Sequence, residues 1–244
     1  MATTTSLSDP GSGVVVRHRV PGFSERWTVP EGMVPEAAWH DEAAELFRQI
    51  VRAFIARTGR DAAVFRNLAV RLQKSRPSVG FDPDVSIVEP PPPGLPDIDS
   101  IRLWEPGHTV PRFSLEVVSK NHPYKDYRET PDQCAAAGVT ELAVFDPKRA
   151  GPKVLGSAPL LSLWLRTPDA SFERVFAGEG PAWSPYLGAW LLPADGGRIL
   201  RVSDDPEGRR LWPTAEEAER AAREAEHAAS LQRIAELEAE LRKR

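Results

Sequence analysis

The chain of 244 residues contains one cysteine, Cys134, and this scarcity limits its chemistry. A single cysteine excludes an internal disulfide and any zinc site built from several cysteines. Cys134 lies in an alanine-rich segment with a helical pattern. We therefore predict that it is a small core residue rather than a reactive thiol.

Long apolar runs and a strong excess of one charge are also missing. No stretch approaches the ~20 consecutive apolar residues that a membrane span requires. Residues 1–13 lack the charged and apolar regions of a signal peptide. We therefore expect a cytoplasmic protein without membrane association. The formal net charge of -4 argues against a broad basic surface for nucleic acid, but it leaves room for a local basic cleft.

Several signatures of catalysis and binding are absent as well. The sequence has no glycine-rich phosphate loop, no pair of histidines at metal-ligand spacing, and no serine–histidine arrangement supported by a motif. Its 7 tryptophans are scattered and do not alternate with basic residues, so we predict no base-stacking platform. Carboxylates remain as the strongest candidates for chemistry.

Two short apolar runs each carry a carboxylate: Phe81 to Val88 contains Asp84, and Arg112 to Ser119 contains Glu116. Valine, isoleucine and phenylalanine dominate both runs, which predicts two β-strands. An ionised carboxylate in a buried strand is costly unless it is paired or bound to a metal.

Lysines follow the second run closely, at Lys120 and Lys125. Carboxylates and a lysine together suggest a divalent-metal site that hydrolyses phosphodiesters, with the Val117 carbonyl as an extra ligand. The alternative is structural: Asp84 is then a turn residue at a strand edge, and Glu116 an ion-paired residue of the sheet.

The rest of the chain alternates helical and strand patterns, which predicts an α/β fold. A helix follows Pro35 and stops at Gly59. A strand, a helix capped by Thr130 with Pro131 in its first turn, and another strand up to Asp146 form a crossover unit. This unit requires at least one parallel pair of strands. Two antiparallel pairs are expected at residues 160–176 and 187–202.

We predict three segments: a disordered tail at 1–13, a single domain at 14–213, and a charged helix at 214–244. Thr214 and Glu217 have the spacing of a capping box. The helix carries a short apolar stripe made of Leu231, Ile234, Leu237 and Leu241. This stripe is shorter than a typical coiled coil. It favours either a helix packed on its own domain or a homodimer contact; a homodimer through the sheet domain is also open.

The order of motifs along the chain resembles one known family. The motifs are Asp-Pro-Asp84-Val, Leu-Glu116-Val-Val-Ser, Lys-Asp126-Tyr, and the strand that ends at Phe-Asp146-Pro. Together they resemble the Uma-two-type restriction endonuclease family, which belongs to the PD-(D/E)XK nuclease superfamily. The resemblance covers roughly residues 30 to 212.

This resemblance implies a restriction-endonuclease-like fold, with a mixed central sheet flanked by helices and a protruding C-terminal helix. It implies that Asp84 and Glu116 bind Mg²⁺, or alternatively Mn²⁺, and that the substrate is DNA. Asp126 corresponds to a common polar position just after the site. His40 matches an early helix in which a histidine is frequent. The loop residues His108 and His122 are weaker candidates.

The chain departs from the family pattern at the lysine. The superfamily motif has a lysine two residues after the acid, where this chain has Val118, and many members have one in the helix, where this chain has Thr130. Lys120 is then the first candidate and Lys125 the second. If neither lysine acts, the chain is a degenerate nuclease fold that serves as a nucleic-acid-binding or protein-interaction module. An arginine partner for Glu116 away from any cleft would favour that alternative.

Overall fold

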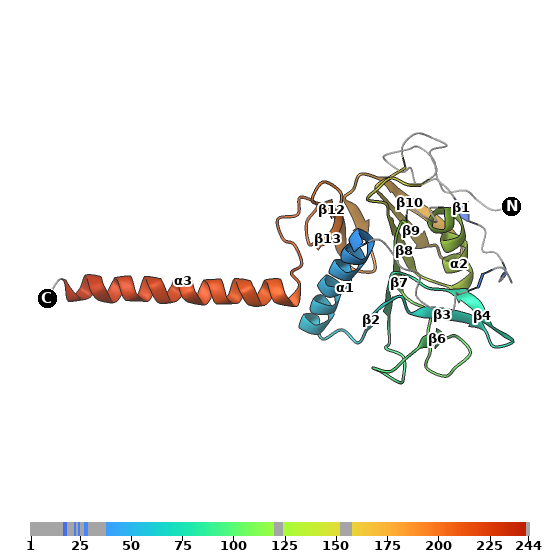
Figure 1. Ribbon diagram of the computed structural model, residues 1–244, viewed down its shortest axis with the longest axis horizontal. Helices are drawn as coiled ribbons and strands as arrows, with labels where there is room; N and C mark the ends of the chain where they lie inside the picture. The colour runs from blue at the N-terminus through green and yellow to red at the C-terminus, as the bar shows by residue number, and fades with distance from the viewer. Residues whose placement is uncertain are drawn as a thin grey trace.

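The computed structural model of the chain describes residues 17–18, 22, 24, 27–28, 38–119, 124–151 and 158–242. Three sheets and a set of helices make up this part of the chain (Figure 1). The helices are α1 (Ala38–Thr58), the π-helical turn η1 (Lys125–Glu129), α2 (Thr130–Ala137) and α3 (Ala215–Leu241).

The largest sheet in the described residues has seven strands in the order β1-β10-β9-β8-β7-β5-β2. Their bounds are β1 (Arg17–His18), β2 (Ala63–Arg66), β5 (Val85–Val88), β7 (Phe113–Val117), β8 (Glu141–Phe145), β9 (Leu161–Arg166) and β10 (Phe172–Gly178). Strands β7 and β8 run parallel, with α2 between them in sequence, and the other neighbours in this sheet run antiparallel. The expected crossover unit is therefore confirmed.

Two smaller sheets pack beside the large one. The first has the order β4-β3-β6 and the second β11-β12-β13. Their bounds are β3 (Ala69–Gln73), β4 (Arg76–Phe81), β6 (Ser100–Arg102), β11 (Ala182–Ser184), β12 (Ala189–Ala194) and β13 (Ile199–Ser203). The expected hairpin between β12 and β13 is confirmed, and Asp195 takes the left-handed conformation in its turn, with φ +51°.

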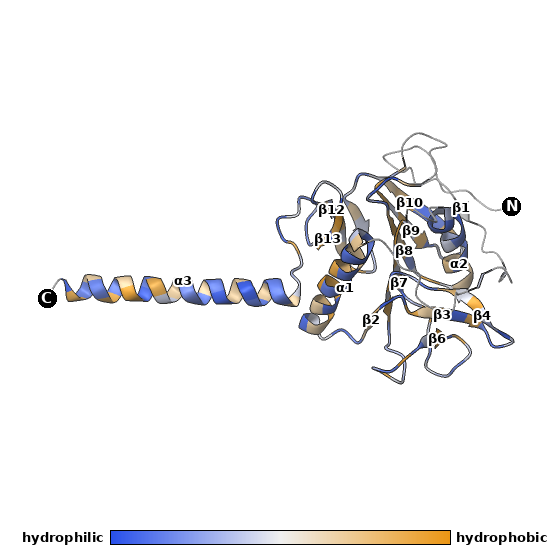
Figure 2. Cartoon of the chain, in the orientation of Figure 1, coloured by the Kyte–Doolittle hydropathy of each residue, from blue (hydrophilic) through white to orange (hydrophobic). Residues whose placement is uncertain are grey.

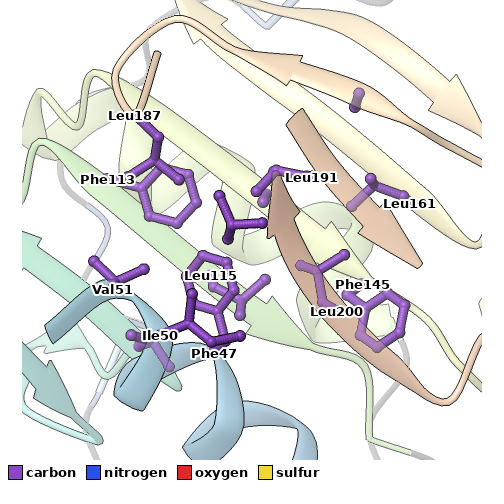
Figure 3. Close-up of a cluster of buried hydrophobic side chains, with 14 of the residues drawn as sticks. Phe47, Ile50, Val51, Phe113, Leu115, Phe145, Leu161, Leu187, Leu191 and Leu200 are labelled. Atoms are coloured by element: carbon purple, nitrogen blue, oxygen red, sulfur yellow. The ribbon is translucent and has the colours of Figure 1, made fainter. Parts of the chain in front are cut away.

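Each face of the large sheet is covered by its own hydrophobic core. The first core joins α1 and the β12–β13 hairpin to the sheet, and Figure 3 shows Phe47 and Ile50 of α1 next to Leu115 of β7. The second core lies on the opposite face and contains Val118 and Cys134. Side chains alternate along a strand, so β7 directs Leu115 and Val117 into the first core and Glu116 toward the second.

Cys134 is fully buried, and burial raises the pKa of its thiol above the usual value. The prediction of a small core residue is therefore confirmed. α1 ends at Thr58, and Gly59 follows with φ +67°, which confirms the predicted stop.

One predicted strand is broken. We predicted a single strand from Phe81 to Val88, but β4 ends at Phe81 and β5 begins at Val85. Pro83 lies in the break, because its nitrogen has no proton to donate to a sheet. The chain thus leaves the β4-β3-β6 sheet and enters the large sheet within three residues, and Asp84 stands immediately before β5.

The predicted cap at Thr130 is wrong. Thr130 has helical angles, φ -61° and ψ -45°, and its N–H donates to the Lys125 carbonyl across a π-helical turn. The helix therefore starts before Thr130, and Pro131 lies inside a continuous run of helical residues. The one-residue slip of a π turn accommodates this proline, which would otherwise interrupt a regular α-helix.

The C-terminal helix α3 begins as predicted and then leaves the body of the protein. Thr214 and Glu217 form both hydrogen bonds of the capping box. None of the described residues of α3 is buried, so packing of the helix on its own domain is wrong. In Figure 2, hydrophobic and hydrophilic positions alternate along the ribbon of this helix. Leu231, Ile234, Leu237 and Leu241 are 44–70% exposed.

No helix within the described ranges combines the length and the apolar character that crossing a membrane requires. The predicted tail at 1–13 lies outside the described residues.

Candidate active site

The two carboxylates singled out by the sequence stand on neighbouring strands of the large sheet. Strands β5 and β7 are antiparallel, and Val85 pairs with Leu115. Continuing that register by one residue sets Asp84 opposite Glu116. Both residues are buried, with 6% and 3% of their surfaces exposed. The fold therefore brings together two acids that are 32 residues apart in sequence.

Two neighbours hold the Asp84 carboxylate in place. The Val117 N–H donates to Asp84 Oδ2 at 2.7 Å, and His40 Nε2, from the first turns of α1, lies 3.3 Å from the same oxygen. His40 is buried. Val117 thus contributes its N–H to the site, and a role for its carbonyl stays a prediction.

Glu116 is in an unfavourable place for a negative charge. Burial raises the pKa of its carboxyl well above the usual value, and the charge of Asp84 raises this pKa further, while Lys125 opposes the shift. Like charges that face each other across two strands are destabilising. Both causes favour the protonated form of Glu116 in the absence of a cation.

Among the residues that the structure describes, Lys125 is the lysine that lies in the site. It is the first residue of the π-helical turn η1. Its Nζ lies 3.5 Å from Asp82 Oδ1, and its side chain is 40% exposed. Burial lowers the pKa of Lys125, but the surrounding carboxylates, led by Glu116 and Asp82, raise it by more, so the net pKa lies above the usual value. Lys125 therefore remains an ammonium ion. Single π turns occur often at functional sites.

Asp126 is a third acid of this cluster. It is buried, and its Oδ2 accepts a hydrogen bond from the Ser119 N–H at 3.3 Å. Burial raises the pKa of Asp126 to about 7, although the charge of Lys125 opposes this shift. The sequence indicated Asp126 only as a polar position implied by the resemblance. The sequence feature that could have indicated Asp126 as a site residue is its position directly after the candidate Lys125.

The remaining candidates lie in different surroundings. Lys120 and His122 lie outside the described residues. Val118 and Thr130, at the two usual lysine positions, are fully buried. His108 accepts a hydrogen bond from the Arg102 N–H through Nδ1, and its Nε2 lies 3.9 Å from Glu105. His108 thus stabilises its own loop.

The donor set limits the kind of metal ion that the site fits. In the part of the chain that the structure describes, no three His, Cys, Asp or Glu side chains are grouped to hold a metal. Asp84 and Glu116 offer hard oxygen donors, and a divalent cation would offset the cost of ionising both buried carboxyl groups. Mg²⁺ suits such a pair, because it binds through one or two carboxylates and keeps several waters.

The mixed sheet, the paired carboxylates at the ends of two strands and the lysine on the following helix define a restriction-endonuclease-like nuclease fold. The chain belongs to the Uma2 family, described as "Putative restriction endonuclease", whose model matches residues 28–156. That range includes Asp84, Glu116, Lys125 and Asp126. Membership of this family gives the chain a nuclease-like function.

A solved structure is similar to part of the chain. It is described as "Crystal structure of a putative nuclease belonging to DUF820 from Anabaena variabilis ATCC 29413", and it has 14% sequence identity and a TM-score of 0.42. The match covers 63% of this chain and 74% of the other. No curated protein matches the sequence.

Proposed function

We propose that the chain is a divalent-metal-dependent endonuclease that hydrolyses DNA phosphodiesters. One observation carries the proposal: Asp84 and Glu116 form a buried pair of carboxyl groups across two strands, and the ammonium group of Lys125 belongs to the same cluster. A buried pair of this kind is costly to a fold without a ligand. DNA as the substrate rests on the description of the family.

Asp84 and Glu116 would hold the metal, Mg²⁺ in the first place and Mn²⁺ as the alternative, with the Val117 carbonyl as an extra ligand. A bound divalent ion would supply positive charge to the scissile phosphate and lower the pKa of a water. The Val117 N–H and His40 keep Asp84 oriented. Glu116 would release its proton when a cation binds, because the cation replaces that proton as the partner of the buried charge.

The state of Lys125 defines its part in the reaction. Because its pKa is raised, the amine is charged and does not serve as a base. It would instead donate hydrogen bonds that orient the attacking water and neutralise charge on the phosphate. In hydrolysis the water oxygen bonds to phosphorus, the bond from phosphorus to the leaving ester oxygen breaks, and one water proton ends on that oxygen. Lys120 remains a candidate for the same role.

Cleavage of supercoiled plasmid with Mg²⁺ or Mn²⁺ tests the proposal. We expect Asp84→Asn and Glu116→Gln to lose at least ~100-fold in rate, and Lys125→Met a similar factor, the size observed when one positioned catalytic group is removed. Lys120→Met, in the same assay, assigns the lysine role. Glu141→Gln, a buried acid elsewhere, and Lys74→Met, an exposed lysine, are matched controls. Equal rates in wild type, Asp84→Asn and Glu116→Gln would refute the proposal.

A degenerate nuclease fold remains the second candidate, and the buried Val118 and Thr130 favour it, since neither usual lysine position carries a cation. It predicts a wild type that binds Mg²⁺ and DNA but leaves both plasmid and single strands intact. In the part of the chain that the structure describes, the charged groups that act most on the Glu116 pKa are three carboxylates and Lys125, and none of them is an arginine. The arginine partner that would have favoured the second candidate is therefore not found among these groups.

A homodimer through α3 is part of the proposal. The stripe of Leu231, Ile234, Leu237 and Leu241 spans one side of the helix, and the four side chains are 44–70% exposed. Apolar side chains that repeat on one helix face stabilise helix pairs. Light scattering should give twice the chain mass for the full protein and the single mass for Leu231→Gln combined with Ile234→Gln. A wild type of single mass would refute the homodimer.

A further inference from the structure

A cavity of about 180 Å³ opens next to the start of α1. Three segments that are distant in sequence line it: the start of α1, the turn after β8, and the start of β13. Its lining residues are Trp39, Glu42, Pro147, Lys148, Arg198 and Ile199. We call it the Trp39 cavity.

The cavity adjoins the site through His40. The ring centroids of Trp39 and His40 are 5.8 Å apart, and His40 Nε2 lies 3.3 Å from Asp84 Oδ2. Lys148 follows β8, whose Phe145 pairs with Val117, the residue after Glu116. His40 therefore connects the Trp39 ring to the Asp84 carboxylate through two direct contacts. A strand that places one base in the cavity can extend from there to the carboxylates.

The lining combines an aromatic ring, apolar walls and cations. Trp39 is half-buried, and the Lys148 ammonium lies 5.4 Å from the centre of its ring. Pro147 and Ile199 add apolar surface. The size suits one base, because an apolar cavity of ~150 Å³ holds a benzene ring.

The charges around the cavity favour a phosphate. Lys148 and Arg198 are exposed cations, whereas Glu42 is an acid in the lining, and Asp195 pairs with Arg198 at 3.2 Å. Exposed pairs of this kind are weak, so Arg198 can turn to a ligand. A cation held over an exposed ring is also bound more weakly than a stacked base. The flexible stem of Lys148 then allows the ammonium to move from the ring to a phosphate.

We propose that the Trp39 cavity receives an unstacked base of a nucleic acid strand, with the adjoining phosphate bound by Lys148 and Arg198. The inference rests on the proposed nuclease function and specifies its substrate: single-stranded DNA, or a site with an unpaired nucleotide. In an intact duplex both faces of a base are covered by its neighbours, so a base must leave the stack to lie against Trp39. Trp39 and Lys148 thus position the strand, and the carboxylates carry the chemistry.

Binding measured without metal separates the cavity from catalysis. Fluorescence anisotropy in EDTA compares a labelled thymidine 12-mer with a duplex of the same length. We expect the single strand to bind more tightly, and Trp39→Leu to weaken that binding by roughly 5- to 100-fold, the range reported for loss of one base–aromatic stack. Trp39→Phe keeps an aromatic ring and should retain most of the affinity.

Matched controls isolate the two contacts. Trp183→Leu removes an exposed tryptophan of β11 and should leave the affinity unchanged. Lys148→Gln should reduce the salt dependence of single-strand binding by ~0.7 in slope, the value for one phosphate contact, and Lys74→Gln should not. Equal binding by wild type, Trp39→Leu and Lys148→Gln would overturn the inference. Equal or tighter binding of the duplex would do the same.

The same binding and cleavage measurements distinguish a nucleic acid strand from a free nucleotide. They also separate failure of the cavity proposal from failure of the nuclease proposal. If free thymidine monophosphate competes as well as the 12-mer, the cavity binds a small nucleotide and the strand assignment is wrong. Trp39-dependent binding without any cleavage would support the cavity and refute the nuclease. Asp84-dependent cleavage that Trp39→Leu leaves unchanged would refute the cavity alone.

Discussion

At the scale of single residues, the described part of the site is a cluster of acids around one ammonium group. Asp84, Glu116 and Asp126 are each buried. The charges of all three act on the ammonium group of Lys125, which lies 3.5 Å from Asp82. Ionised groups in such a place destabilise the fold until a cation arrives. Stability and metal binding should therefore be linked at Glu116.

Glu116→Gln should raise the melting temperature of the metal-free protein at pH 8, because it replaces a costly charge with a neutral group of the same shape. Mg²⁺ should raise the melting temperature of wild type by mass action, by about 2–4 °C for each kcal/mol of binding free energy. The variant should lose most of this response. Thermal unfolding with and without Mg²⁺ measures both effects, and an unchanged Mg²⁺ response in Glu116→Gln would exclude Glu116 as a ligand.

Glu141 provides a second test, away from the site. It is fully buried, its Oε2 accepts the Tyr186 N–H at 3.0 Å, and burial raises its pKa from 4.5 to about 7. The folded state therefore binds the proton more tightly than the unfolded state does. The contribution of Glu141 is fully present below pH 4.5 and is lost as the pH rises through 7, a loss of about 3 kcal/mol.

Glu141→Gln should remove this pH dependence, since glutamine stays neutral and retains an acceptor for the Tyr186 N–H. Urea unfolding at pH 4.5 and pH 8 should show similar stabilities at the lower pH and a more stable variant at the higher pH. Its Mg²⁺ response should equal that of wild type. A variant less stable than wild type at pH 8 would show that Glu141 is ionised and satisfied in the fold.

At the scale of elements, helix α3 depends on its first turn rather than on packing. The Thr214 hydroxyl accepts the Glu217 N–H at 3.1 Å, and Arg201 holds the Glu217 carboxylate. Thr214→Val should cost about 1 kcal/mol of helix stability, because a buried methyl cannot accept that bond. The variant should show less helical circular dichroism and faster trypsin cleavage after Arg220, with an unchanged body. Thr58→Val, at the end of α1, is the control, and equal cleavage rates in both variants would contradict the prediction.

Local patterns predicted most elements, and the exceptions have physical causes. Acids inside apolar strands made Asp84 and Glu116 visible in the sequence. Pro83 interrupts the strand that the valine and isoleucine residues predicted. The π turn places the start of the helix before Thr130, whereas Thr130 and Pro131 had predicted it at Thr130 itself. In each case hydrogen bonds to a distant segment or a slipped turn outweighed the local pattern.

Local sequence patterns could not predict the neighbours of the carboxylates, because these neighbours are brought there by tertiary contacts. His40 reaches Asp84 from a helix 44 residues earlier in the sequence. Trp39, Lys148 and Arg198 converge from three separate segments. Scattered tryptophans without neighbouring basic residues gave no reason to expect a stacking surface, yet the fold supplies those neighbours from elsewhere. Periodicity describes one segment at a time and does not report such convergence.

At the scale of the whole molecule, the body should fold without its C-terminal helix. No described side chain of α3 is buried, so deletion of residues 221–244 removes little packing. We expect the truncated protein to melt within about 2 °C of the full chain, which corresponds to less than ~1 kcal/mol. Tryptophan fluorescence measures this, since all seven tryptophans precede the deletion. A loss of 5 °C or more would show that α3 supports the body.

The same projecting helix determines how the protein moves through solution. Its 27 residues extend about 40 Å at ~1.5 Å each, whereas a compact body of this size has a radius of gyration of ~17 Å. Drag increases with the longest dimension more than with mass. Even a monomer of 26.9 kDa should therefore leave a gel-filtration column ahead of globular proteins of its own mass, and light scattering is the measurement that counts its chains.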